Sequence, residues 1–262
     1  MSIAKALTLL QMRYIISDIY HGKYTERELM NFLWSEQNIR WFLDASSYTG
    51  FHKELAARIS PYLESSDTLG DIGCGLGRLD LELAPHVANL TAIDINETVI
   101  AQLQHDATRL ELQNVYARCA DVTEMTDSFD VTVMSFFGKP VTDSGYRRFC
   151  RRRAIRIVNT KNFGNLYPSN HRQTSRDTVP TIQHELDKQG YRYQLITAAI
   201  EFGQPLRSWQ EAEQFVLHNA PKITKKEALD FLQGSATNTG RSDFPVYIPN
   251  QKELGIFVIH CD

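Results

Sequence analysis

The sequence is poor in cysteine and has no cluster of residues spaced for metal binding. Its four cysteines, Cys74, Cys119, Cys150 and Cys261, are scattered over 262 residues without the short spacings that zinc sites require. Two of them fall in or at the ends of stretches expected to form buried strands. Reduced thiols in a cytosolic compartment are the simplest interpretation, so we expect a cytoplasmic protein.

Long apolar runs and a strong charge of one sign are also missing. The apolar patch at residues 6–10 is interrupted by Gln11 and Arg13, which makes it too short for the core of a signal peptide or a membrane span. The net charge of −3 does not favour nucleic acid or an anionic membrane as a partner. No repeat is visible, and the length suits one large domain or a domain with an appendage.

The most informative stretch is rich in glycine. Residues 69–77 read Leu-Gly-Asp-Ile-Gly-Cys-Gly-Leu-Gly, with Gly73, Gly75 and Gly77 at alternate positions and Asp71 two residues ahead of them. Glycine adopts backbone angles that other residues avoid and lets a ligand approach the main chain closely. A loop of this kind between a strand and a helix is expected to leave free N–H groups directed at an anion.

The spacing of the glycines excludes two common phosphate-binding loops. A dinucleotide fingerprint needs a third glycine in the sixth position, where this chain has Arg78 or Asp80 depending on the register. A P-loop needs a Gly-Lys-Ser/Thr sequence, which does not follow. The remaining interpretation is a ligand with both charges, such as an amino-acid tail. Its carboxylate would meet the helix N-terminus and its ammonium would be drawn toward Asp71.

Residues 71–77 closely resemble the first motif of class I S-adenosylmethionine-dependent methyltransferases. That family binds the methionyl end of its cofactor at this loop. The resemblance therefore implies S-adenosylmethionine as cofactor and S-adenosylhomocysteine as product. It makes Cys74 a small side chain beside the cofactor rather than a nucleophile. The implied contacts in the loop are Asp71, Gly73, Cys74, Gly75 and Gly77.

Two acids downstream extend the resemblance. Asp94 ends the stretch 90–95, which is similar to the family's second strand, and it is expected to hold both ribose hydroxyls. Asp121 lies in the stretch 118–122, similar to the end of the third strand, and would meet the adenine amino group. Three further residues are expected to contact the cofactor: Ile95, Val122 and Ser135.

The order of the expected elements predicts an α/β fold. From residue 68 onward strands and helices alternate, which indicates a parallel sheet with helices on both faces. The resemblance implies a doubly wound, mostly parallel, seven-stranded Rossmann-like sheet whose last strand is antiparallel. We expect residues 1–62 to form an N-terminal helical cap or lid. Residues 63–262 would form the methyltransferase domain, with a helical insertion at about 203–252.

The segment after the fourth predicted strand, 129–135, should face the methyl group. It reads Ser-Phe-Phe-Gly-Lys-Pro from Ser135, without the Asn-Pro-Pro-aromatic pattern of adenine and glutamine amino-group methyltransferases. The acid of metal-dependent catechol-type enzymes is also missing, because Ser135 stands there, so we expect no metal. Phe136 or Phe137 could lie against the sulfonium or an aromatic acceptor, or could simply be core residues.

The aromatic stretch before the sheet has two interpretations. Trp41, Tyr48, Phe51 and His52 resemble the lid that small-molecule methyltransferases fold over the cofactor, with Tyr48 covering the methionyl tail. An aromatic stripe at helical spacing is more often part of a core. His52 and His171 are weak candidates for a catalytic base, since a lone histidine is usually structural or solvated.

These features predict a methyltransferase that moves a methyl group by in-line displacement onto a small-molecule acceptor. One alternative is an RNA or protein methyltransferase that docks its substrate on the arginine run from Arg147 to Arg153. As a helix leading into a fifth strand at 154–159, that run could equally be a solvated face with Phe149 and Cys150 turned inward. The acidic total favours the solvated face. Another alternative is a non-catalytic partner subunit that keeps the fold.

Overall fold

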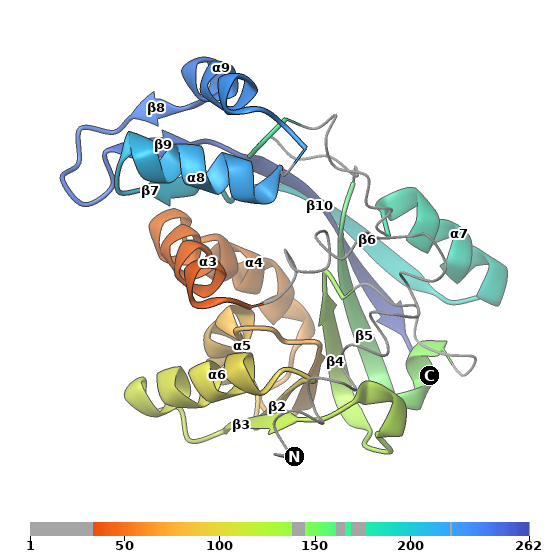
Figure 1. Cartoon of the computed structure of the whole chain (residues 1–262). Helices are drawn as coiled ribbons and strands as arrows, with labels where there is room; N and C mark the ends of the chain where they lie inside the picture. The colour runs from red at the N-terminus through yellow and green to blue at the C-terminus, as the bar shows by residue number, and fades with distance from the viewer. Residues whose placement is uncertain (1–33, 138–144, 161–165, 169–176, 221, 262) are drawn as a thin grey trace, which may run out of the picture.

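A seven-stranded sheet runs through the centre of the molecule (Figure 1). The computed structural model describes residues 34–137, 145–160, 166–168, 177–220 and 222–261. The strand order is β3-β2-β1-β4-β5-β10-β6. The strands are β1 (Thr68–Ile72), β2 (Asn89–Asp94), β3 (Val115–Cys119), β4 (Phe129–Ser135), β5 (Cys150–Asn159), β6 (Tyr193–Glu201) and β10 (Gln251–His260).

The direction of the strands confirms the predicted fold class. The pairs β1–β2, β1–β4, β2–β3 and β4–β5 are parallel, whereas β10 is antiparallel to both β5 and β6. The strand order reverses direction around β1, which pairs with β2 on one side and β4 on the other. In doubly wound sheets ligands bind at such a switch point, outside the carboxyl ends of the strands.

Helices cover both faces of the sheet (Figure 1). On one face lie α4 (Phe51–Ile59), α5 (Arg78–Leu83) and α6 (Glu97–Arg109), whose apolar side chains share a core cluster with alternate residues of β1, β4 and β5. On the other face α7 (Val179–Gln189) packs in a second cluster. Because both faces are covered, five of the seven residues of β4 are buried, the polar Thr132 among them. None of the helices in the described ranges is long and apolar enough to cross a membrane.

A smaller three-stranded sheet, in the order β7-β9-β8, is formed by residues between β6 and β10. It consists of β7 (Gln204–Leu206), β8 (Thr237–Asn238) and β9 (Val246–Ile248), together with α8 (Trp209–Asn219) and α9 (Lys225–Ser235). Trp41, on the N-terminal helix α3 (Glu36–Thr49), is buried in its core cluster. Sequence positions far apart therefore share one hydrophobic core here. The first 33 residues of the expected cap lie outside the described part of the chain.

The arginine run is helical only in part: Arg147 and Arg148 lie in the short 3-10 helix η4 (Gly145–Arg148), and Phe149 and Cys150 are buried as expected. The strand begins at Cys150, four residues earlier than predicted, so Arg151, Arg152 and Arg153 are strand residues. Arg151 pairs with Asp130 at 3.0 Å, Arg152 with Asp67 and Glu64, and Arg153 donates to a backbone carbonyl. Backbone pairing with β4 and ion pairs with nearby carboxylates allow charged residues to occupy this strand. The run lies at the amino end of β5, opposite the edge that carries the glycine loop.

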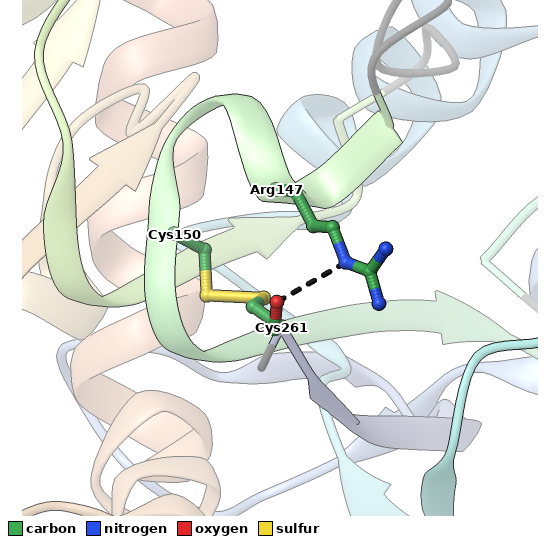
Figure 2. The surroundings of a disulfide bond; sticks show 3 residues. All are labelled: Arg147, Cys150 and Cys261. Atoms are coloured by element: carbon green, nitrogen blue, oxygen red, sulfur yellow. Dashed lines mark hydrogen bonds between the residues drawn. A yellow bond between two sulfur atoms is a disulfide. The ribbon is translucent and has the colours of Figure 1, made fainter.

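The expectation of four reduced thiols is wrong for two of them. Figure 2 shows Cys150 joined to Cys261 in a disulfide, with their Cα atoms 6.2 Å apart, and Arg147 donating a hydrogen bond to the Cys261 carbonyl. Sequence spacing hides this pair because the two residues are 111 positions apart. The antiparallel pairing of β10 with β5 brings them together. The expected cytoplasmic location relied on free thiols, so the disulfide removes that support.

The disulfide predicts a definite labelling pattern. Unfolded but unreduced protein treated with an alkylating reagent is expected to be modified at Cys74 and Cys119, which are free, and not at Cys150 or Cys261. After reduction all four cysteines should react. Peptide mass spectrometry reads both states. Modification of Cys150 and Cys261 without prior reduction would contradict the bond.

Candidate functional site

We call the loop between β1 and α5, residues 73–77, the glycine loop. Gly73, Gly75 and Gly77 have φ angles of +78°, +55° and +61°, which side-chain-bearing residues rarely adopt. A Cβ at Gly73 would lie 2.1 Å from the Phe137 ring, and one at Gly77 would lie 2.4 Å from a methyl group of Leu103. Glycine is thus required both for the backbone turn and for close packing around it.

The backbone amides of the loop differ from the expectation of free N–H groups. Gly73 N and Cys74 N both donate to the carbonyl of Ile93, at 2.8 and 3.0 Å, and Gly77 N donates to Cys74 O at 3.0 Å. Gly75 N donates to the Asp94 carboxylate at 3.0 Å. These four amides tie the loop to itself and to the neighbouring strand, because a turn this tight brings donors and acceptors of its own into range. The loop offers a ligand close backbone approach rather than a row of vacant donors.

Asp94, the last residue of β2, is held in a fixed orientation. Its Oδ2 accepts from Gly75 N and its Oδ1 accepts from Asn96 N at 2.9 Å. Asn96 in turn caps α6, accepting from the amides of Thr98 and Val99. Burial raises the pKa of the Asp94 carboxyl, and the backbone hydrogen bonds hold part of that rise back. Each carboxylate oxygen accepts more than one hydrogen bond, so the oriented group can still bind a pair of hydroxyls.

The other residues expected to contact adenosine gather at the same edge of the sheet. The backbone of Asp94 pairs with Cys119 at the end of β3, and Ala120 N donates to Asp94 O at 3.0 Å. Asp121 follows directly and precedes the short 3-10 helix η3 (Val122–Glu124). Ile95 is 48% exposed, which is unusual for isoleucine beside a carboxylate. This edge therefore combines an oriented acid with an uncovered apolar side chain.

Asp71 lies beneath the glycine loop beside a second buried acid, Asp80 of α5. The two residues are 1% and 0% exposed, and Asp71 Oδ1 and both Asp80 oxygens have no hydrogen-bond donor in the described part of the chain. Burial raises the pKa of Asp80 to about 7, and burial together with Asp80 raises the pKa of Asp71 well above its usual value. Asp80 did not stand out in the sequence, where it lies among the leucines of a short helix.

The surroundings of Cys74 agree with a minor role in the loop. Burial raises the pKa of its thiol, and the carboxyls of Asp80, Asp71 and Asp94 raise it further. A thiol that stays protonated is a poor nucleophile. Cys74 is therefore better suited to packing beside a ligand than to attacking one.

A second aromatic residue at the glycine loop, Trp34, was missed by sequence reasoning. Its indole lies 3.3 Å from the position that a Cβ of Gly75 would take, and its ring packs edge-on against Phe42 with centroids 5.5 Å apart. It directly precedes Ser35, the N-cap of α3. The sequence signal that could have pointed to Trp34 was its position, an aromatic residue directly before the N-cap of a helix.

The aromatic residues of the expected lid pack into other parts of the molecule. The Tyr48 ring stacks on Tyr247 of the small sheet with centroids 4.9 Å apart, and Arg241 lies over the Tyr48 ring as well. Trp41 is 5% exposed and donates from Nε1 to Glu211, and Phe51 is 1% exposed. Trp41 and Phe51 are therefore core residues, and Tyr48 packs on the small sheet rather than on the glycine loop.

His52 is placed poorly for a general base. Its Nδ1 lies 2.8 Å from the Ser46 hydroxyl. Burial, with the charges of Lys252 and Arg78, lowers the pKa of His52 to about 3, so the imidazole is neutral and only weakly basic near pH 7. His171, the other candidate, lies outside the described residues. Within the described ranges no three His, Cys, Asp or Glu side chains lie together as a metal site would need.

The end of β4 carries an aromatic surface. Phe136, next after Ser135, has a φ of +54° although it is not glycine. The ammonium of Lys252 lies 4.1 Å from the centre of the Phe136 ring and 4.9 Å from that of Phe202. These rings already face a cation of the protein itself. Phe137 instead packs on the backbone of Gly73.

Comparison with known proteins agrees with this geometry. Residues 70–156, which run from β1 into β5, match a family model described as a methyltransferase domain. The YcgJ protein from Bacillus subtilis shares the fold at 13% identity and a TM-score of 0.52, over 80% of this chain and 97% of that one. The protein BH2331 from Bacillus halodurans C-125 does so at 14% identity and a TM-score of 0.52, over 80% and 98%. A search of curated protein sequences finds no relative of this chain.

The glycine loop after β1 and the acid that ends β2 lie together at the switch point of the sheet, within the residues that match the methyltransferase domain. The match over residues 70–156 shows a methyltransferase domain in this part of the chain, and the likeness to solved structures shows that the fold is the Rossmann-like fold of such domains.

Proposed function

We propose that this protein binds S-adenosylmethionine across the carboxyl ends of β1, β2 and β3 and transfers the methyl group to a small-molecule acceptor. The observation that carries the proposal is the hydrogen bond of 3.0 Å from Gly75 N to Asp94. It joins the glycine loop to the acid that ends the next strand, at the switch point of the sheet. The product would be S-adenosylhomocysteine.

The residues at this edge fit the parts of the cofactor. Asp71, buried with an unpaired oxygen among the described residues, suits the methionyl ammonium, and the loop backbone allows close approach of the methionyl tail. Asp94 would hold both ribose hydroxyls. We assign the cover of the methionyl tail to Trp34 rather than Tyr48, because Trp34 is the ring beside Gly75.

The adenine would lie between the ends of β2 and β3. Ile95, nearly half exposed, offers one apolar surface, and Val122 lies at the start of η3. Asp121 would accept from the adenine amino group. We assign Ser135, which ends β4, to the methyl end of the cofactor. These roles extend the family pattern to the side chains of this chain.

The chain's own task in methyl transfer is alignment. S-adenosylmethionine supplies a methyl carbon that an acceptor attacks in line with the departing sulfur. Holding acceptor and methyl carbon in that line contributes up to about 7–11 kcal/mol toward the barrier. The aromatic side chains after β4 would exclude water from this edge. An acceptor that is already nucleophilic needs no base, which accords with a neutral, weakly basic His52.

We further propose that α3 and the segment 203–252 together cover the acceptor side of the site. The indole of Trp41 donates to Glu211, Arg40 pairs with the same carboxylate, and Arg207 forms a two-pronged ion pair with Asp44 at 2.6 and 3.0 Å. These bonds fasten α3 to the start of α8, so the two segments would act as one cover (Figure 1). In this proposal residues 1–62 are the cap and 63–262 the catalytic domain.

The arginine run gives little support to RNA or protein as the acceptor. The side chains of Arg151 and Arg152 are paired with carboxylates of the same chain. They also lie at the amino end of β5, away from the edge that carries Asp94. Guanidinium groups that are already paired would have to exchange partners to bind phosphate. A small-molecule acceptor is therefore the favoured interpretation.

Calorimetric titration tests the cofactor. We expect S-adenosylmethionine and S-adenosylhomocysteine each to bind with one site per chain. ATP, which shares the adenosine but lacks the methionyl tail, should not bind, because the loop lacks the features of a phosphate loop. No heat of binding with either adenosyl ligand at millimolar concentration would contradict the proposal.

Transfer of a labelled methyl group tests the acceptor class. Purified protein and labelled S-adenosylmethionine are added to a cell extract, which is then separated into small molecules, RNA and protein. Label is expected in the small-molecule fraction. Label confined to RNA or protein would contradict the acceptor class, and cofactor binding without any transfer would indicate a non-catalytic partner subunit.

A further inference from the structure

Two carboxyl groups beneath the glycine loop have no donor among the described residues to satisfy them. Asp71 comes from β1 and Asp80 from α5, and both side chains are almost completely enclosed, at 1% and 0% exposure. Asp71 Oδ1 and both Asp80 oxygens lack such a donor, yet the two carboxyls lie within hydrogen-bonding reach of each other. Since neither brings a donor when ionised, only a proton held between them can join them.

The charges around this Asp71–Asp80 pair do not neutralise it. Asp94 at the end of β2 adds a negative charge, and the Cys74 thiol from the loop stays protonated. Arg78, at the start of α5, directs its guanidinium to Asp106 of α6 at 3.5 Å. On α4, His52 is neutral near pH 7. Among the described residues, the pair is therefore enclosed without a matching positive charge.

Two enclosed carboxyl groups side by side cannot both ionise near neutral pH, because each charge would lose its hydration and repel the other. Burial accordingly raises the pKa of both groups, that of Asp80 to about 7. As a coupled pair they titrate in two steps that belong to the pair rather than to either residue. Near pH 7 the pair stands between a neutral form and a form with one negative charge and one shared proton.

We propose that Asp80 makes cofactor binding proton-linked: the Asp71–Asp80 pair receives the methionyl ammonium in its singly charged form and releases one proton as it does so. The inference rests on the proposed function. The balance is simple, since the neutral pair loses a proton to solvent and the resulting single negative charge matches the single positive charge of the ammonium. Asp80 is a positioning residue, because it acts on the ligand through Asp71.

The test measures how many protons the protein releases when it binds the ligand. S-adenosylhomocysteine is titrated into the protein in two buffers that differ in ionisation enthalpy, at about pH 6 and about pH 8. The wild type is expected to release close to one proton at the lower pH and almost none at the higher, and to bind about tenfold more weakly at the lower pH. Asp80→Asn should release almost none at either pH and change its affinity less than about threefold between them.

Two comparisons isolate the pair. Glu82→Gln removes a charge from the same helix at a half-buried position and is expected to behave like the wild type. The amino group of the ligand titrates equally in all three proteins, so the difference between them belongs to Asp80. Equal proton release by the wild type and Asp80→Asn would overturn the inference and leave cofactor binding intact. No binding by any of them would overturn both.

Infrared spectroscopy of the ligand-free wild type tests for the shared proton without relying on the Asp80→Asn variant. At about pH 7–8 the ordinary carboxyl groups are ionised, so absorption by a protonated carboxyl is expected from the pair alone. Addition of S-adenosylhomocysteine should lower that absorption at about pH 6, where the pair loses its extra proton. Absence of any protonated-carboxyl absorption in the ligand-free protein near pH 7 would contradict the shared proton.

Discussion

Replacing Asp94 by alanine is expected to weaken binding of S-adenosylhomocysteine by about ten- to a hundredfold. The carboxylate would hold the ribose hydroxyls, and hydrogen bonds to a charged group contribute roughly 1.5–3 kcal/mol. The same side chain also fixes the glycine loop through Gly75 N at 3.0 Å, so its removal loosens the loop as well. Calorimetry of the two proteins gives the ratio of dissociation constants.

Two further variants separate these contributions. Asp94→Asn keeps the shape and one acceptor, so its affinity should lie between those of the wild type and the alanine variant. Glu97→Ala removes an exposed carboxylate from the first turn of α6 and is expected to leave affinity within about twofold, because exposed charges contribute little. An unchanged dissociation constant in Asp94→Ala would remove Asp94 from the site.

Replacing Gly77 by alanine is expected to destabilise the protein by about 2–5 kcal/mol. The residue has a φ of +61°, and an added Cβ would lie 2.4 Å from the Leu103 side chain. The left-handed backbone and the overpacking each contribute to the loss. For a chain of this size the melting temperature should fall by roughly 5–15 °C, which differential scanning calorimetry measures.

Gly190 provides the matched control for this prediction. It has a φ of +70° at the end of α7, and nothing in the described part of the chain lies within 4 Å of its Cβ position. Gly190→Ala therefore carries only the backbone cost, about 1–2 kcal/mol. Equal loss of stability in the two variants would show that contact with Leu103 does not constrain the loop.

Local patterns predicted much of the sheet and the loop. The fourth strand, 129–135, was predicted from its resemblance to the family's fourth strand, and the structure has the same bounds. The helix α7 runs from Val179 to Gln189, with Pro180 in its first turn and Gly190 in the left-handed conformation at its end, which are the positions that these residues favour in helices. Caps and breakers of this kind act within a few residues of each other, so the sequence carries them directly.

Tertiary contacts explain what the sequence did not predict. The capping-box pattern Thr-x-x-Glu from Thr224 forms a full capping box in the structure. The same kind of pattern from Ser208 is only half formed, because the Glu211 carboxylate accepts instead from Arg207 N and from Trp41 of α3. The early start of β5 depends on pairing with β4. The Cys150–Cys261 disulfide depends in the same way on the pairing of β5 with β10.

In the candidate site, too, some residues could be predicted from the sequence and others are revealed only by tertiary contacts. The acids that follow β2 and β3, Asp94 and Asp121, were predicted from the resemblance, supported by their order along the chain. Asp80 and Trp34 were missed because their relation to the loop arises only when α5 and the segment before α3 fold back onto it. In helical sequence a buried carboxylate looks the same as an exposed one.

A crystal structure of the protein with S-adenosylhomocysteine tests the account most directly. We predict density for the nucleoside along the carboxyl ends of β1 to β3, with the ribose hydroxyls on Asp94 and the amino-acid end at the glycine loop beside Asp71 and Trp34. Density for the ligand at any other surface, with the glycine loop closed as in the free protein, would contradict it.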